Sequence, residues 1–419
     1  MKPLPMSGIL TAGMLLLSAC SGGGNAASPV APQSQMRGAT QTEGAAFLKA
    51  PFTQANNVRR ACNASPGPGQ AACLALVRTD VAGPLVTDHG YGPPALQGAY
   101  NLPSSTAGTG QTVAVVEAYD DPNAESDLAF YRSYYSLPPC TTANGCFRKL
   151  NEDGKAKPLP AACGDCGWDV ELSLDMEMVS AGCPNCNVVV MEASTSNLSD
   201  LGTAVDSAVK KVGATVVSNS YQGGGGGSKK DLKQEAKYFD HPGAIILASS
   251  GDGGYENTEG IPAAFASVVA VGGTTLSYAG KRISETVWDG SGSGCNNAVK
   301  KPSWQTGAAG TDCSGRTAND VAAVGDPNTG VAVYDTYEGG TWYVVGGTSV
   351  SSPLVGSVYA LAGNASSLNA AQSLYASGAS LYDITSGNNG SCSPANLCNG
   401  ATGYDGPTGN GTPNGASAF

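Results

Sequence analysis

The chain has 419 residues, and its 22 Lys and Arg against 33 Asp and Glu give a formal charge of −11. Hydrophobic residues make up 41% and charged residues only 13%, about half the usual share of roughly 25%, so the chain can build a large core and wholesale disorder is excluded. An acidic, lysine-poor surface argues against nucleic acid as a partner. Only two histidines are present, which leaves little room for histidine-based catalysis or a multi-histidine metal site.

The N-terminus carries a short apolar run that is typical of a signal peptide over residues 1–20, because it is too short to cross a membrane as a helix. It ends in Leu17-Ser18-Ala19-Cys20, which resembles the bacterial lipobox, where the cysteine is lipidated. We expect an exported protein, either a cell-envelope lipoprotein or extracellular, that touches the membrane only through a lipid anchor at Cys20. An ordinary signal peptide with an incidental cysteine is the alternative.

Twelve cysteines remain without Cys20, an even number that favours disulfides in an exported chain. Their spacing suggests four local pairs: Cys62/Cys73, Cys140/Cys146, Cys295/Cys313 and Cys392/Cys398. The other four have the spacing C-x2-C-x16-C-x2-C, which also fits a zinc ribbon: Cys163, Cys166, Cys183 and Cys186. The compartment and the carboxylate-bearing segment between them favour disulfides over zinc, but the spacing leaves three pairings open.

Residues 21–87 contain a Gly/Ser-rich tether and a short pro-like segment, and the main domain is expected over residues 88–419. In that domain, apolar β-branched runs alternate with helical segments, which predicts an α/β fold with a parallel sheet and helices on both faces. The predicted strands are 112–116, 188–191, 214–217, 244–247 and 268–271, and the helices between them include 200–212 and 229–239. From about residue 386 the chain is rich in Gly, Asn, Ser and Thr, so we expect loops.

A candidate nucleophile lies where a short strand enters a Gly turn and a helix begins near Ser349. A serine there faces the positive end of a helix dipole, and nearby backbone N–H groups can hold an oxyanion. A simple helix N-cap is the alternative. The whole motif Gly-Thr-Ser-x-x-x-Pro, ending at Pro353, resembles the nucleophile motif of the subtilisin-like clan of serine peptidases. Neither His89 nor His241 lies in the His-Gly-Thr segment that a subtilisin needs for its base.

Residues 167–180 predict a helix on which Glu171 and Asp175 lie one turn apart on the same face. Like charges at this spacing repel, and a solvated acidic face is the alternative. Glu-x-x-x-Asp, together with Gly-Thr-Ser-x-x-x-Pro and no catalytic histidine, resembles the sedolisins, serine-carboxyl peptidases with a subtilisin-like fold. The resemblance covers roughly residues 88–419.

The resemblance implies that Glu171 is the general base, that Asp175 orients it and that Ser349 attacks the peptide carbonyl. It also implies that Asp252, in a Ser-Gly-Asp-Gly turn, donates to the oxyanion when protonated. Glu117 would support the catalytic helix, and Tyr221 stands where some members have Trp. The expected activity is acid-active serine-type endopeptidase cleavage of protein or peptide substrates by a monomer; the alternative is a catalytically silent, peptidase-fold binding lipoprotein.

Sedolisins wrap one structural Ca²⁺ in their C-terminal loops. Matching positions here are Asp383 and Asp405 for carboxylates, and Ile384, Ala401 and Gly403 for backbone carbonyls. Most members also carry a long prosegment, whereas only residues 21–87 lie between Cys20 and the catalytic region. We therefore expect a reduced prosegment or none, and self-processing stays open.

Overall fold

The computed structural model describes residues 57–62, 66–81, 90–224, 229–255, 260–307, 312–376 and 380–419, except for the side chains of 229–231. All of them belong to one compact unit, Glu43–Phe419. The predicted signal peptide, Cys20 and His89 lie outside these residues. Within the described ranges, no helix has both the length and the apolar content needed to cross a membrane.

The centre of the unit is a sheet in the order β12-β11-β9-β7-β4-β6-β5, with β15 also paired to β11. Every neighbouring pair is parallel except β11/β12. Its strands are β4 (Thr112–Ala118), β5 (Phe147–Asn151), β6 (Asn187–Ala193), β7 (Val216–Asn219), β9 (Ile245–Ser249), β11 (Val268–Tyr278), β12 (Arg282–Val287) and β15 (Val321–Val324). The five predicted strands are confirmed, while β5, β12 and β15 were not predicted.

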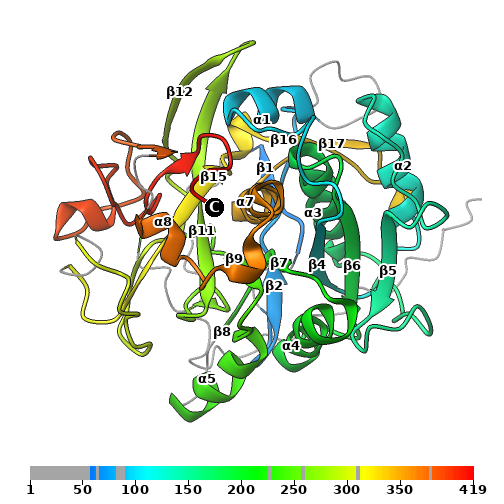
Figure 1. The fold of residues 1–419 in the computed structure, drawn as a ribbon, viewed down its shortest axis with the longest axis horizontal. Helices are drawn as coiled ribbons and strands as arrows, with labels where there is room; N and C mark the ends of the chain where they lie inside the picture. The colour runs from blue at the N-terminus through cyan, green and yellow to red at the C-terminus, as the bar shows by residue number, and fades with distance from the viewer. Residues whose placement is uncertain are drawn as a thin grey trace, which may run out of the picture. The chain divides into compact units, whose positions relative to one another are not determined.

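Helices cover both faces of this sheet, which confirms the predicted fold class. α3 (Trp168–Gly182) and α7 (Thr348–Ala362) lie side by side across the strands (Figure 1). Alternate strand residues point to opposite faces, so Val115 packs into the core with these two helices, whereas Val116 packs into a second core with α4 (Leu198–Ser207). The other α-helices with given bounds are α1 (Pro93–Ala99), α2 (Ala124–Tyr134), α5 (Lys229–Glu235) and α8 (Gln372–Ala376).

The segment before the main domain contributes strands that the sequence did not predict: β1 (Val58–Arg60), β2 (Ala71–Cys73) and β3 (Leu76–Arg78). β2 extends a small sheet containing β8 (Tyr221–Gly224) and β10 (Gly260–Ile261). β1 and β3 extend another containing β16 (Val331–Tyr334) and β17 (Trp342–Gly346). These strands therefore pack as part of the domain that they precede.

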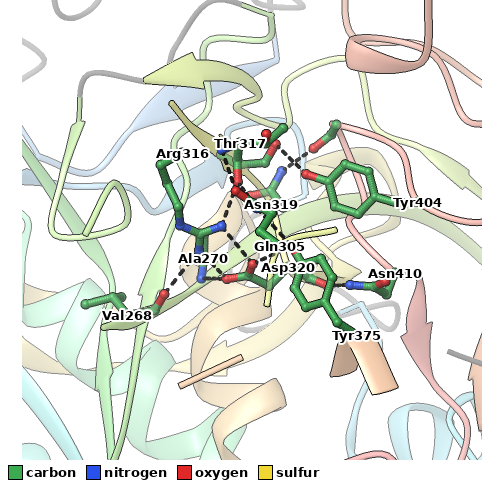
Figure 2. A network of polar contacts seen from close by, with 12 residues as sticks. Val268, Ala270, Gln305, Arg316, Thr317, Asn319, Asp320, Tyr375, Tyr404 and Asn410 are labelled. Carbon is green, nitrogen blue, oxygen red and sulfur yellow. Dashed lines mark hydrogen bonds and ion pairs between the residues drawn. The ribbon is translucent and has the colours of Figure 1, made fainter. Parts of the chain in front are cut away.

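A buried ion pair fastens the loop-rich C-terminal segment to the sheet (Figure 2). Arg316 donates to both carboxylate oxygens of Asp320, and the same carboxylate accepts the Tyr375 hydroxyl at 2.9 Å. Both nitrogens of Asn410 donate to the Asp320 carbonyl. The predicted dominance of loops is confirmed, since beyond Ser386 the described chain has only β19 (Thr412–Pro413), two isolated bridges and one short 3₁₀ turn, Ala395–Leu397.

The cysteines pair as disulfides in the described chain. The four expected local pairs are present. The remaining four form Cys163–Cys166 and Cys183–Cys186, one of the three pairings that spacing left open. The zinc-ribbon alternative is therefore wrong for this structure, because the four sulfurs are already bonded in pairs.

Candidate active site

Ser349 is the second residue of α7 and is fully buried. Gly347, the residue just before α7, has φ +99°, and a Cβ there would lie 2.0 Å from the Leu74 carbonyl oxygen. Glycine is thus required both for the turn and for the close approach of another backbone. The Ser349 hydroxyl donates to the Ser220 carbonyl at 3.2 Å and lies close enough to the Glu171 carboxyl to lower its pKa.

Glu171 projects from the first turn of α3 toward Ser349 and is also fully buried. Burial raises its pKa well above the ordinary value, and the charge of Asp175 raises it further. Its Oε2 accepts the backbone N–H groups of Leu74 at 2.9 Å and Ala75 at 2.8 Å. The alternative of a solvated acidic face is therefore wrong, because α3 is buried on the side that carries both carboxyls.

Asp175 lies one turn beyond Glu171 and joins it to Glu117, which stands near the end of β4. Burial raises the pKa of Asp175 to about 8, and hydrogen bonds with Ser220 and Glu117 oppose that rise. Burial also raises the pKa of Glu117 well above normal, followed by the charges of Asp175 and Glu171. Because both carboxyls bind protons more tightly than in water, a proton held between Glu117 and Asp175 satisfies the pair.

Asp252 lies just after β9 and contacts Thr348, the first residue of α7. Its Oδ1 accepts the Thr348 N–H at 2.8 Å and the Thr348 hydroxyl at 2.9 Å, whereas its buried Oδ2 has no partner. Burial raises the pKa of Asp252 to about 6, while the charge of Arg60 works in the opposite direction. A proton on Oδ2 would make this atom a hydrogen-bond donor beside Gly347.

Other predicted positions lie as follows. His241 contacts the Tyr238 carbonyl at 2.9 Å beyond the short turn that follows α5, so it serves the fold there. The Tyr221 hydroxyl donates to Asn219 at 2.8 Å, and its ring packs 6.1 Å from that of Trp168. The sequence analysis missed the Ser220 carbonyl and the Leu74–Ala75 backbone, because their parts in the site depend on main-chain atoms.

The predicted calcium positions converge in the C-terminal loops. Gly403 donates its N–H to Asp383 at 3.0 Å, and Ala401 donates its N–H to Asp405 at 3.1 Å. The Ile384 carbonyl lies beside the neighbouring Gly400. Burial raises the pKa of the Asp405 carboxyl to about 7, and the charge of Asp383 adds to that rise. Within the described chain, no group of three or more His, Cys, Asp or Glu side chains is placed to hold a metal.

The chain belongs to the subtilase family, whose model matches residues 162–381. Its resemblance to the sedolisins is confirmed by two relatives. Kumamolisin of Bacillus sp. (strain MN-32) is 31% identical over 367 residues, and sedolisin of Pseudomonas sp. (strain 101) is 27% identical over 359 residues. Each alignment covers 77% of this chain, but the chain spans only 62% and 60% of the lengths of those relatives.

A solved structure agrees with this assignment. Pseudomonas sedolisin, a serine-carboxyl proteinase complexed with two molecules of pseudo-iodotyrostatin, superposes with a TM-score of 0.66 at 25% sequence identity. The superposition covers 78% of this chain and 95% of that one.

Proposed function

We propose that this protein is an acid-active serine-carboxyl endopeptidase that hydrolyses protein or peptide substrates. The observation that carries the proposal is the meeting of four side chains at the start of α7. The Ser349 hydroxyl lies beside the Glu171 carboxyl, Asp175 follows Glu171 one turn along α3, and the unpartnered Oδ2 of Asp252 faces the same turn.

In this mechanism Glu171 takes the proton of Ser349 as the hydroxyl attacks a peptide carbonyl, and then gives it to the leaving amine. Asp175 positions Glu171, and the proton shared with Glu117 keeps that part of the network from carrying several negative charges. Asp252 stabilises the oxyanion by donating from Oδ2, which requires its protonated form. Acid activity follows from this requirement, because the donor is lost when Asp252 ionises.

A fluorophosphonate probe tests the assignment, since it labels only an activated serine. We expect labelling of Ser349 at acid pH, none in Ser349→Ala, and a loss of about 10²-fold or more in Glu171→Gln, as expected for removal of a general base. Circular dichroism of each variant is the folding control. A folded wild-type protein that neither takes the probe nor cleaves a peptide library would favour the silent binding lipoprotein instead.

We also propose that one Ca²⁺ binds in the C-terminal loops. Supporting this, Asp383 and Asp405 each accept a backbone N–H of the segment 401–403, which brings both carboxylates to the same stretch of chain. Asp383, Asp405 and the carbonyls of Ile384, Ala401 and Gly403 would hold the ion. Its effect would be structural, since a cation relieves the repulsion between the two carboxylates and ties the loops together.

Export with a lipid on Cys20 is part of the same proposal and is supported by the Leu-Ser-Ala-Cys sequence alone. The intact mass of the N-terminal peptide, isolated from a membrane fraction, tests it. A diacylglyceryl-modified Cys20 is expected. A mature N-terminus that lies beyond residue 20 and carries no lipid would refute the lipid anchor and favour secretion with an ordinary signal peptide.

A further inference from the structure

The surface of the unit carries an open groove of about 670 Å³, which is within the usual size range of ligand-binding pockets. One wall comes from α5 and the short 3₁₀ turn after it, Ala236–Phe239. The other walls come from the residues that lead into β11 and from the loop that follows β13 (Gly294–Asn296). The proposed catalytic mechanism gives this groove no role.

The groove and the candidate active site lie at opposite ends of the parallel strands. β9 and β11 run side by side in the same direction. Residues 265–267 of the groove come directly before β11, whereas Asp252 comes just after β9. Asn369 lines the groove and follows the C-terminal end of α7, the helix whose first turn carries Ser349. Because α7 has 15 residues and is therefore about 22 Å long, a ligand in the groove leaves the catalytic cleft open.

The floor of the groove is apolar. Phe265 is buried there, and its ring centre lies 5.7 Å from that of Phe239 in the core. Leu232, Ala236 and Val299 are half-buried, since they pack against the same core and also line the groove. Apolar surface at the bottom of an open groove favours a ligand that brings apolar side chains of its own.

The rim of the groove is basic, although the whole chain has a formal charge of −11. One aspartate, Asp240, lines it against three exposed lysines: Lys233, Lys237 and Lys300. Among the described residues, none forms an ion pair with these lysines, and Lys237 donates only to the side-chain oxygen of Gln234, at 3.2 Å. Other lysines do pair with aspartate: Lys149, Lys155, Lys210 and Lys211. The three ammonium groups of the rim therefore have donors left for the carboxylates of a ligand.

We propose that this groove binds an acidic peptide segment that also carries apolar side chains, and that it thereby holds protein substrates at a distance from the bond that is cut. The binding site itself stands on the groove alone, whereas its role in holding substrates rests on the proposed peptidase function. Carboxylates of the segment would pair with the lysines of the rim, and its apolar side chains would contact Phe265 and Val299. A peptide suits the groove better than a membrane surface does, because a concave groove admits a single chain and a lipid surface is flat.

Direct binding tests the site without any catalysis. The probe is the peptide Glu-Leu-Glu-Phe-Glu with an N-terminal rhodamine, added to full-length Ser349→Ala protein at pH 6, where its carboxylates and the lysines are all charged. Fluorescence anisotropy should show saturable binding that weakens as NaCl is added, because salt screens exposed charges. The same peptide with Gln in place of each Glu should bind about tenfold more weakly.

Two triple variants separate the groove from the overall charge, since each replaces three exposed lysines by Gln. The groove variant combines Lys233→Gln, Lys237→Gln and Lys300→Gln. The control variant changes lysines outside the groove: Lys155→Gln, Lys157→Gln and Lys281→Gln. The groove variant should bind the acidic peptide about tenfold more weakly, because three exposed charge pairs of ordinary strength amount to about that factor. The control variant should change binding less than about twofold.

A single substitution carries the test if circular dichroism shows that the groove variant does not fold. Ala298 is exposed on the wall of the groove, so a larger side chain there costs no packing. Ala298→Asp should weaken binding of the acidic peptide because its carboxylate repels those of the ligand. Ala298→Ser is the matched control and should bind as the parent protein does.

The role in holding substrates is tested with active enzyme. A neutral fluorogenic peptide is compared with the same peptide joined, at either end, to Glu-Leu-Glu-Phe-Glu through a flexible Gly/Ser linker. One of the two extensions should lower KM about fivefold or more and leave kcat unchanged, because binding in the groove raises the effective concentration of the cleavable part. The groove variant should lose this gain and still cleave the unextended peptide at the wild-type rate.

The binding site is refuted if the acidic peptide binds no better than its Gln analogue, or if the groove and control variants bind it equally. It is also refuted if the rim lysines are needed for binding to phosphatidylglycerol vesicles but the peptide does not bind. An unchanged KM with both extensions would refute the role in holding substrates. Failure of the peptidase function looks different, since the acidic peptide would then bind to a folded protein whose Ser349 takes no fluorophosphonate.

Discussion

Substituting Asp252 tests the chemistry most directly, because Asn keeps the shape of the side chain and donates a hydrogen bond at every pH. In the structure Oδ1 of Asp252 accepts two bonds from Thr348, and Oδ2 is unpartnered. The amide of Asp252→Asn can reproduce this, with its oxygen toward Thr348 and its NH₂ at the position of Oδ2. The variant should therefore retain activity but lose its dependence on a proton.

The magnitude follows from the pKa of about 6 for Asp252. One unit above it, at pH 7, only about a tenth of the molecules keep the proton, so the wild-type kcat/KM should fall about tenfold, or about 1.4 kcal/mol, between the acid plateau and pH 7.

The fall of kcat/KM at high pH should report the ionisation of Asp252 and not that of the base, Glu171. Glu171 gains charge as pH rises, which increases the amount of active base, so its titration produces a rising limb. Over the same range kcat/KM of Asp252→Asn should change less than about twofold, because an amide does not titrate. Asp252→Ala should lose about 10²–10³-fold at pH 5, the usual cost of deleting an oxyanion donor.

The assay measures kcat/KM on a fluorogenic peptide from pH 3 to pH 8. The concentration of active enzyme in each sample is taken as the amount of Ser349 that the fluorophosphonate probe labels. Two results would refute the reasoning. One is an alkaline limb in Asp252→Asn that coincides with the wild-type limb. The other is an Asp252→Ala variant that keeps full activity at pH 5.

The remaining predictions concern stability and are measured in Ser349→Ala protein to prevent autolysis. Burial raises the pKa of Asp121 to about 7 and that of Asp335 to about 8; the stability from such groups is complete below their ordinary pKa and is lost as pH rises through the raised one. The Tm should therefore fall from pH 5 to pH 8, less so in Asp121→Asn, and a flat profile would contradict this. Asp320→Asn leaves Arg316 charged, buried and unpaired and should cost about 3–5 kcal/mol in urea unfolding. Asp206→Asn, at the half-buried partner of the exposed Lys210, should cost less than about 1 kcal/mol, and equal costs in the two variants would refute the role given to burial. Exhaustive chelation should lower Tm, with recovery on adding Ca²⁺ but not in Asp383→Ala; an unchanged Tm and no calcium by elemental analysis would remove that site.

The central strands and the placement of Glu171 and Asp175 on one helix face could be predicted because their signals are local, whereas their proposed roles with Ser349 came from the resemblance to the sedolisins. A continuous β-branched run gives a buried parallel strand, and Glu171 and Asp175 are related by one helical turn whatever surrounds them. β5 was missed because Phe147–Asn151 contains Arg148 and Lys149 and lies at the sheet edge, where only one side of the strand is paired. Pattern alone does not distinguish such a strand from a loop.

The N-terminal strands were missed for a different reason. Ala71–Val77 is a continuous apolar run, which was a usable signal for buried strands, but it lay in a segment interpreted as tether and pro-like. Its pairing partners β8 and β17 lie far along the chain, and no local pattern specifies such pairing. The donors of the hydrogen bonds from Leu74 and Ala75 to Glu171 are backbone N–H groups, so side-chain motifs in that segment could not reveal them.

The buried carboxyls connect the predicted acid stability with the proposed acid activity through one physical cause. Glu117, Glu171 and Asp175 each bind a proton more tightly than in water because they are removed from solvent. Low pH supplies those protons, so the conditions that satisfy the network also protonate Asp252. Part of that burial comes from Leu74 and Ala75, whose backbone N–H groups donate to Glu171. If this stretch of backbone were displaced, water would reach Glu171 and lower the pKa of the base toward the acid range in which Asp252 is still a donor.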